Sequence, residues 1–196
     1  MKETGIIMSG DHPRLILDGL KTMTRRTRGL KRFNEKPDDW VAHHIAGAEW
    51  EFKNIHTLAD YHILCPYGGV GDRLWVRETW GALGYGKSLP IDREAMQNRL
   101  VYGENAGWQC RRSSLFMPRW ASRILPEITE LRAERLLEIT DREIELEGIK
   151  VPDLPGSETL RHRFSRLWDS LNAKRGYPWE GNWWVWVIGF RMVERR

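Results

Sequence analysis

The sequence is poor in the features that define several large protein classes. It has two cysteines among 196 residues, which excludes a disulfide-rich secreted scaffold. Its longest apolar run has eight residues, from Trp183 to Phe190, whereas a membrane-spanning helix needs about 20. The N-terminus has no long apolar stretch, so we expect no signal peptide and a cytoplasmic protein.

Strong charge of one sign is also absent. Lys and Arg number 31 against 27 Asp and Glu, which gives a net charge of +4 with neutral histidine. This mild excess permits an anionic partner without requiring one. There is no internal repeat, no glycine-rich phosphate loop and no G-x-S-x-G nucleophile elbow. The length predicts a single domain over residues 1–196.

Tryptophan, by contrast, is abundant, with eleven residues. A buried indole needs a partner for its N–H, so one interpretation is an aromatic core. The other is a stacking surface, because aromatic side chains stack on nucleobases without sequence preference. The count alone leaves both interpretations open.

The apolar pattern predicts an α+β fold with a small mixed sheet or barrel. Strands are expected at residues 5–8, 73–79, 100–102, 124–136 and 183–193; helices are expected from Asp11 to about residue 20 and at residues 91–98, 140–148 and 157–173. Pro126 implies that its strand lies at an edge or contains a bulge. The last strand is apolar on both faces, so we expect it at the centre of the sheet.

Lys21 and Thr24 are the first candidate for chemistry. They are three residues apart and follow Gly19, which suggests the end of a helix. A desolvated, neutral lysine could act as a base that activates a threonine nucleophile. The alternative is a solvated basic helix end that complements the helix dipole.

Two glutamates are candidate acids. Glu78 follows Leu74 and Val76 on one face of a predicted strand, so it either projects inward or reaches solvent or an arginine. Glu147 precedes Gly148 at the end of a short helix opened by a Thr140–Glu143 capping box. A glutamate is unfavourable at a helix C-terminus, which slightly favours a role for Glu147.

Arg119, Trp120 and Arg123 are a candidate site for stacking a base and holding a phosphate, or else surface arginines stacked on tryptophan. A zinc site can be drawn from two histidines and the two cysteines, which are His56, His62, Cys65 and Cys110. These residues lack the usual ligand spacing, so we expect neither a metal nor another cofactor.

Several motifs in order resemble ASCH (activating signal cointegrator homology) domains. Gly19-x-Lys21-x-x-Thr24-x-Arg26 is similar to the G-x-K-x-x-T-x-R signature of that family. The stretches 71–78, 117–123 and 184–190 resemble its larger branch, found in phages and prophages. The resemblance implies a PUA-like fold, a small β-barrel with flanking helices, and a cavity for a nucleobase or nucleotide.

The resemblance also implies an activity. Small bacterial members are amidohydrolases of N(4)-acetylcytidine, in which a lysine accepts a proton, a threonine is the nucleophile and a glutamate donates a proton. These roles fall on Lys21, Thr24 and Glu147, with Glu78 as a rival for the acid. Another member is a ribonuclease, so the fold alone does not fix the reaction.

A non-catalytic RNA-binding module is the alternative. Its base and phosphate contacts are expected among Arg25, Arg26, Arg77, Glu78, Trp80, Arg119, Trp120 and Arg123. The expected partner is a modified nucleoside or RNA. The chain departs from small family members by insertions at about residues 29–69 and 81–116, which flank the signature and the strand before Glu78.

Overall fold

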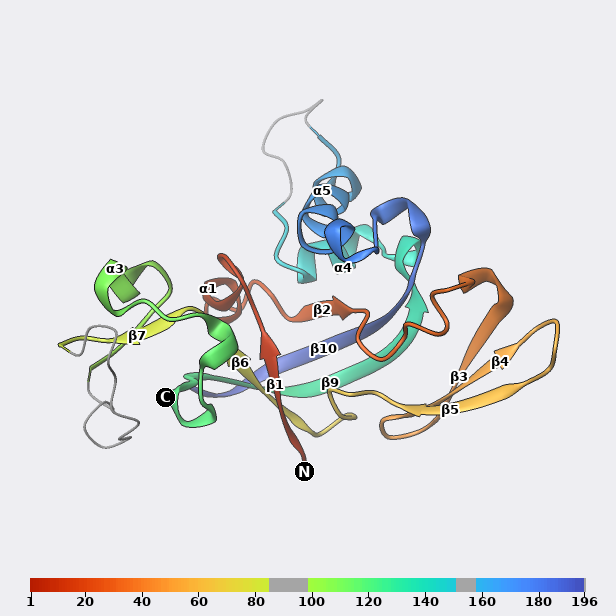
Figure 1. The fold of residues 1–196 in the computed structure, drawn as a ribbon, viewed down its shortest axis with the longest axis horizontal. Coiled ribbons are helices and arrows are strands. Elements are labelled where there is room, and N and C mark those ends of the chain that lie inside the picture. Colours follow the sequence, from red (N-terminus) through yellow and green to blue (C-terminus); the bar gives the residue numbers. More distant parts are fainter. Residues whose placement is uncertain (85–98, 151–157, 196) are drawn as a thin grey trace.

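The computed structural model describes residues 1–84, 99–150 and 158–195. Its strands are β1 (Glu3–Ile7), β2 (Met23–Arg26), β3 (Trp40–Ala46), β4 (Glu49–Asn54), β5 (Asp60–Leu64), β6 (Arg73–Arg77), β7 (Trp80–Ala82), β8 (Leu100–Tyr102), β9 (Ile124–Arg135) and β10 (Trp184–Arg195). Its α-helices are α1 (His12–Leu17), α3 (Gly107–Cys110), α4 (Asp141–Leu146) and α5 (Leu160–Asn172). Short 3-10 turns connect them. The architecture is α+β (Figure 1).

The main sheet has five strands in the order β1-β6-β9-β10-β2. β1 runs parallel to β6, and the other neighbours are antiparallel. The long β9–β10 ladder runs from the Trp184–Arg135 pair to the Arg195–Ile124 pair. Pro126 lies beside the register irregularity between Met192 and Glu194, so the predicted bulge is confirmed, although β9 is an inner strand.

Strand β10 separates two cores, as its apolar pattern predicts. Trp184, Trp186 and Ile188 join one cluster, whereas Val185 and Val187 join the other. Alternate side chains of a strand point to opposite faces, so both faces of β10 are buried. Helices α4 and α5 cover the face that carries the two valines (Figure 1). α5 forms within the predicted range, and the Thr140–Glu143 capping box opens α4.

The two edge strands of this sheet, β1 and β2, face each other without pairing. No backbone ladder joins them in the parts of the chain that the structure describes. One side-chain bond crosses the gap, from an Arg26 Nη to the Ile7 carbonyl at 2.8 Å. The sheet that the described residues form is therefore curved but open, so the small β-barrel that the resemblance implies is not confirmed.

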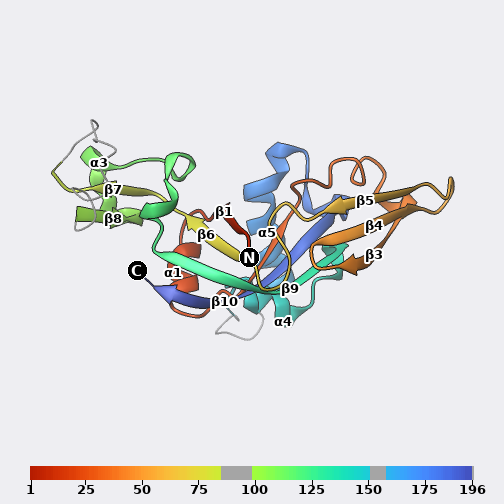
Figure 2. The same ribbon diagram turned by 90° about the horizontal axis from the view of Figure 1, so that it is seen from below.

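The insertion at residues 29–69 forms an antiparallel sheet of β3, β4 and β5. It packs its inner face on the main core, where Phe52 stacks on Phe33 and meets the ring of Trp184 edge to face. The second insertion carries β7, β8 and α3, and the helix expected at residues 91–98 lies outside the described residues. Figure 2 shows the two insertions at opposite ends of the main sheet.

A buried asparagine fixes the first insertion to β10. Asn34 donates from Nδ2 to the Trp184 carbonyl at 3.0 Å and accepts the Trp184 N–H at 2.7 Å.

We expect Asn34→Ala to lower the free energy of unfolding by about 2–4 kcal/mol, because two buried backbone groups lose their partner. Chemical denaturation measures this loss. Asn105→Ala, at an exposed position, is the control and should change stability by about 0.5 kcal/mol or less; an equal effect of both substitutions would contradict the assignment.

Candidate active site and basic cleft

A buried ion pair forms the centre of the candidate site. The Lys21 side chain has no solvent exposure, and its Nζ donates to Glu147 Oε2 at 2.6 Å and to the Glu147 carbonyl at 2.8 Å. Burial lowers the pKa of Lys21, although the adjacent Glu147 opposes the shift. The pair therefore places a lysine with reduced proton affinity directly against a carboxylate.

Local backbone geometry brings Lys21 to Glu147. Gly19, after α1, has φ +73°, a left-handed conformation that suits glycine, and the following N–H of Lys21 bonds to the Leu15 carbonyl. The Thr22 N–H then donates to the Leu146 carbonyl at 2.9 Å, which ties this turn to the end of α4. Gly148, with φ +91°, turns the chain away directly after Glu147, and a Cβ added to it would lie 3.3 Å from Lys21 Cβ.

Arg25 holds Glu147 from the other side. Its Nη1 lies 3.4 Å from Glu147 Oε1, and its Nη2 lies 2.8 Å from Glu134 and 3.1 Å from Glu143. Arg132 bonds both Glu134 and Glu143, so the two arginines share two carboxylates. Arg25 was a predicted contact for base or phosphate, but its guanidinium is already occupied by these three glutamates.

Thr24 lines a small pocket next to this pair. The residue is 3 % exposed, on β2 opposite Ile188 of β10. Its hydroxyl makes no hydrogen bond with any described residue. The pocket has a volume of about 30 Å³, and its lining includes Glu147, Phe164 and Trp168. Glu147 thus links the two other predicted residues, because it bonds Lys21 and lines this pocket together with Thr24.

The small pocket adjoins a much larger cleft. Both are lined by His12, Arg25, Arg26, Leu171 and Asn172. The cleft has a volume of about 540 Å³ and lies between the edge strands β1 and β2. Six basic side chains line it, namely Arg25, Arg26, Arg28, Lys31, Arg77 and Arg175. Its lining includes no aspartate or glutamate.

Apart from Arg25, the cations of the cleft lack carboxylate partners. Within residues 1–84, 99–150 and 158–195, no carboxylate forms a salt bridge with Arg26, Arg28, Lys31, Arg77 or Arg175. Arg26 is the most constrained of them, because it bonds the Ile7 carbonyl while its Nε is buried without a partner. Burial lowers the pKa of Arg26. A desolvated cation without a counter-ion is costly, so the cleft favours an anionic ligand.

His12 is a residue of this site that the sequence analysis did not identify. It is the first residue of α1 and lines both the cleft and the small pocket. The pKa of His12 is lowered to about 4, mainly by burial and secondarily by the charge of Lys21. The imidazole is therefore neutral near pH 7. Its only sequence signal is its place before Pro13 at a helix start, which carries no chemical meaning by itself.

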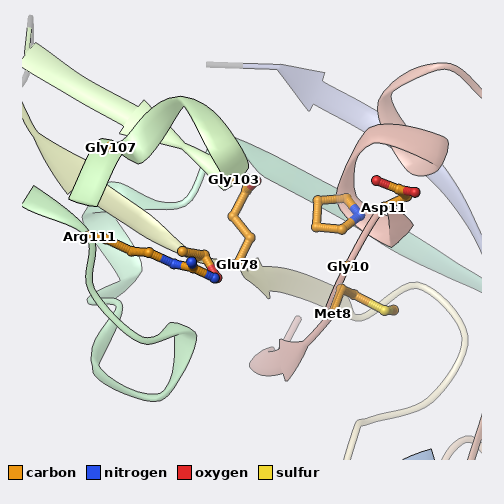
Figure 3. Close-up of a pocket in the computed structure, with 9 residues that line it drawn as sticks. Met8, Gly10, Asp11, Glu78, Gly103, Gly107 and Arg111 are labelled. Atoms are coloured by element: carbon orange, nitrogen blue, oxygen red, sulfur yellow. The ribbon is translucent and has the colours of Figure 1, made fainter. Parts of the chain in front are cut away.

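Glu78 belongs to a different pocket. Both of its oxygens accept hydrogen bonds from Arg123, at 2.9 and 3.0 Å. It lines a cavity of about 360 Å³ together with Arg111, Met8 and Asp11 (Figure 3). This cavity shares no lining residue with the small pocket at Thr24. Glu78 therefore pairs with an arginine, which is one of the alternatives that the sequence left open, and it is not part of the Lys21 site.

The remaining predicted contact residues are also engaged elsewhere. Arg119 forms a salt bridge with Glu3, and Arg123 also lies over the ring of Tyr102. Trp80 and Trp120 meet edge to face, with Trp80 buried. Of the contacts that were expected, Arg25, Arg26 and Arg77 line the cleft.

The four residues considered for zinc do not gather. No group of three or more His, Cys, Asp or Glu side chains suited to a metal occurs in the described part of the chain. His62 bonds Glu49, and burial raises the pKa of Cys65 to about 11. No helix among the described residues is both long and apolar enough to cross a membrane.

Comparison with known proteins gives one structural likeness. An ASCH domain from Lactobacillus crispatus JV V101, known from a high-resolution crystal structure, is similar over 99 % of this chain and 81 % of its own. The two share 12 % sequence identity, and the TM-score is 0.42. No family model matches the chain, and no curated protein matches it. At this TM-score the likeness supports no conclusion about the site.

The lowered pKa of His12 predicts an acid-dependent loss of stability. The unfolded chain takes up this proton near pH 6.5 and the folded chain only near pH 4, so the unfolded state binds more protons between these values. We expect the free energy of unfolding to fall as the pH drops through this window, and His12→Gln to reduce that fall. Denaturation at several pH values and NMR titration of the His12 ring measure both effects. A His12 midpoint near 6.5 would contradict the buried, neutral imidazole.

Proposed function

We propose that the protein binds a phosphate-bearing nucleoside in the basic cleft and hydrolyses an N-acyl group from the exocyclic amine of its base, as in N(4)-acetylcytidine. One observation carries this proposal. Thr24 and Glu147 line a small pocket, and Glu147 is paired with the buried Lys21. This pocket adjoins a cleft in which, apart from Arg25, the cations form no salt bridge with a carboxylate of the described residues. The resemblance to ASCH domains points to the same residues, and the geometry supports a role for each.

The size of the small pocket favours attack on a small group. A volume of about 30 Å³ has room for roughly two water-sized groups, which is too little for a base. A short acyl group fits beside Thr24, while the base and its phosphate occupy the cleft of about 540 Å³. The apolar wall formed by Phe164, Leu167 and Trp168 suits the alkyl end of such a group.

The Lys21–Glu147 pair supplies both the base and the acid. Transfer of the proton that Lys21 shares with Glu147 yields a neutral amine and a carboxylic acid, which are the forms that the first step requires. Thr24 Oγ1 then adds to the acyl carbon, and its proton passes to Lys21 Nζ. Arg26, whose Nε lacks a partner, stands to donate to the oxyanion. The C–N bond breaks as Glu147 protonates the leaving amine.

The second half of the reaction restores the starting state. Water adds to the acyl-Thr24 ester and gives its proton to the Glu147 carboxylate. The ester C–O bond breaks, and the Lys21 ammonium returns a proton to Thr24 Oγ1. The products are the nucleotide with a free exocyclic amine and a carboxylic acid. Neither half requires a metal ion.

A non-catalytic RNA-binding module is the second candidate, favoured by the unpaired cations of the cleft. A ribonuclease that uses Glu78 finds less support, because Glu78 lies in a separate pocket and pairs with Arg123. In addition, the Thr24 pocket is too small to admit a phosphodiester.

The decisive experiment uses chromatography to follow the formation of cytidine 5′-monophosphate from N(4)-acetylcytidine 5′-monophosphate. Thr24→Val keeps the shape of the side chain but removes the nucleophile, so we expect the rate to fall by about 10³-fold or more. Lys21→Met should lose activity to a similar extent.

Thr57→Val, on the exposed β4–β5 connection, is the matched control and should keep full activity. Thermal melts of all variants confirm that each is folded. Full activity of folded Thr24→Val would overturn the mechanism. Binding of the nucleotide without any release by the native protein would favour the non-catalytic module.

A further inference from the structure

We infer that the substrate nucleotide is an internal residue of a single-stranded polynucleotide, with separate cationic sites for the phosphates on its two sides. The inference rests on the proposed function in that it takes the Thr24 pocket as the place of the reacting group. It goes further in excluding a free nucleoside or mononucleotide as the preferred ligand. The evidence is the distribution of the unpaired cations along the cleft.

One cationic site lies beyond β2. Arg28 and Lys31 come from the segment that follows β2, and Arg175 comes from the 3-10 turn after α5. Arg26, Arg28 and Arg175 all act on the same phenol, that of Tyr67, and lower its pKa against the larger opposing effect of burial. All three of these cations therefore act on one place in the cleft, that of the Tyr67 ring.

The second cationic site is Arg77, at the end of β6. Its Nε donates to the Ser114 carbonyl at 3.1 Å, and its Nη2 bonds the Leu115 carbonyl. These bonds fix the guanidinium at the cleft wall beside Ile7, its register partner in β1. The remaining Nη1 has no hydrogen bond with a described residue. A cation held in this way is well placed to receive a phosphate oxygen.

The two sites come from different elements of the cleft wall. In Figure 1, the segment after β2 lies on one side of β1, and the green segment that contains Ser114–Phe116 lies on the other. Arg26 and His12, which also line the small pocket, occupy the middle of the cleft. A nucleotide with its acyl group at Thr24 therefore enters a cleft that carries cations from both of these elements.

The chemistry of the ligand follows from this arrangement. A nucleoside has no phosphate, and a mononucleotide has one. An internal nucleotide of a strand carries phosphates on both its 5′ and 3′ sides, and so it can engage both sites at once. Aromatic side chains lie next to both cationic sites. Tyr67 and Tyr177 line the cleft, and Phe116, which follows Leu115, is 74 % exposed. Such side chains stack on neighbouring bases of an unpaired strand.

A base in a duplex cannot reach Thr24, because it is stacked and paired. Thr24 is 3 % exposed and lines the small pocket, so the base must leave any stack to present its acyl group. A single strand meets this requirement at the least cost.

The test measures binding of unacylated cytidine-centred pentanucleotides, so that it does not depend on turnover. One oligomer keeps all its phosphates, and two others carry a neutral methylphosphonate immediately 5′ or 3′ of the central nucleotide. We expect Arg77→Gln and Arg175→Gln each to weaken binding of the full pentamer by about tenfold. Each should also flatten the dependence of log affinity on log salt by about 0.7.

The two variants should then respond to different phosphates. Arg77→Gln and the native protein should bind one methylphosphonate oligomer with equal affinity, because the phosphate that Arg77 contacts is already neutral there. Arg175→Gln and the native protein should bind the other methylphosphonate oligomer with equal affinity. Arg191→Gln, which removes one charge outside the cleft, is the matched control and should bind as the native protein does. Ribose and deoxyribose pentamers compared in parallel show which sugar is preferred.

Two results would overturn the inference: cytidine monophosphate binding as tightly as the pentamer, or both variants depending on the same phosphate. Either result leaves the proposed hydrolysis intact, since a mononucleotide remains a substrate for the same site. Conversely, two-sided pentamer binding without release of acetate from an acetylated pentamer would retain the polynucleotide site and refute the proposed reaction.

Discussion

The ion pair between Lys21 and Glu147 is the interaction on which the surrounding structure depends. Removing two charges from water costs several kcal/mol for each ion, and their mutual attraction repays this only with good geometry and further hydrogen bonds. The protein provides both. Lys21 also donates to the Glu147 carbonyl, and Glu147 also meets Arg25. The turn at Gly19, the end of α4 at Gly148 and the Thr22–Leu146 bond are all arranged around this contact.

Two neighbouring arginines differ in whether their positive charge is neutralised by carboxylates. Arg25 lies among Glu134, Glu143 and Glu147 and serves to hold the acid in place. Arg26, the next residue, bonds only a backbone carbonyl and a methionine sulfur. Successive residues of a strand point to opposite faces, so one arginine completes the interior network while the next faces the cleft. The same short strand thus builds a neutralised interior and an unneutralised binding surface.

Local patterns predicted the parts of the fold that depend on local chemistry. The apolar faces of β10, the capping box of α4 and the amphipathic α5 are each determined by residues a few positions apart. The sheet of β3, β4 and β5 was missed, because most residues of β3 and β5 are exposed and these two strands lack a regular alternation of apolar and polar residues. Of the three residues chosen from the resemblance, Glu147 bonds Lys21 and lines a pocket with Thr24, and their catalytic roles stay a prediction.

The cleft could not be predicted in the same way. Arg28, Arg77 and Arg175 are far apart in the sequence, and each is unremarkable there. Only the curvature of the main sheet places them along one cavity. Likewise, the sequence around Glu78 did not show whether it would meet Lys21 or an arginine, because that choice depends on the path of the segment that carries Arg123.

The gap between β1 and β2 has a thermodynamic consequence. A sheet that closed here would gain backbone hydrogen bonds along both edges, and acidic residues in the cleft would relieve the repulsion among its cations. The protein has neither, so the free form gives up stability where the ligand binds. Any anion that occupies the gap stabilises the folded state in proportion to the logarithm of its concentration above the dissociation constant. Inorganic phosphate or sulfate alone should therefore raise the melting temperature, and the ligand takes the structural place of a missing partner strand.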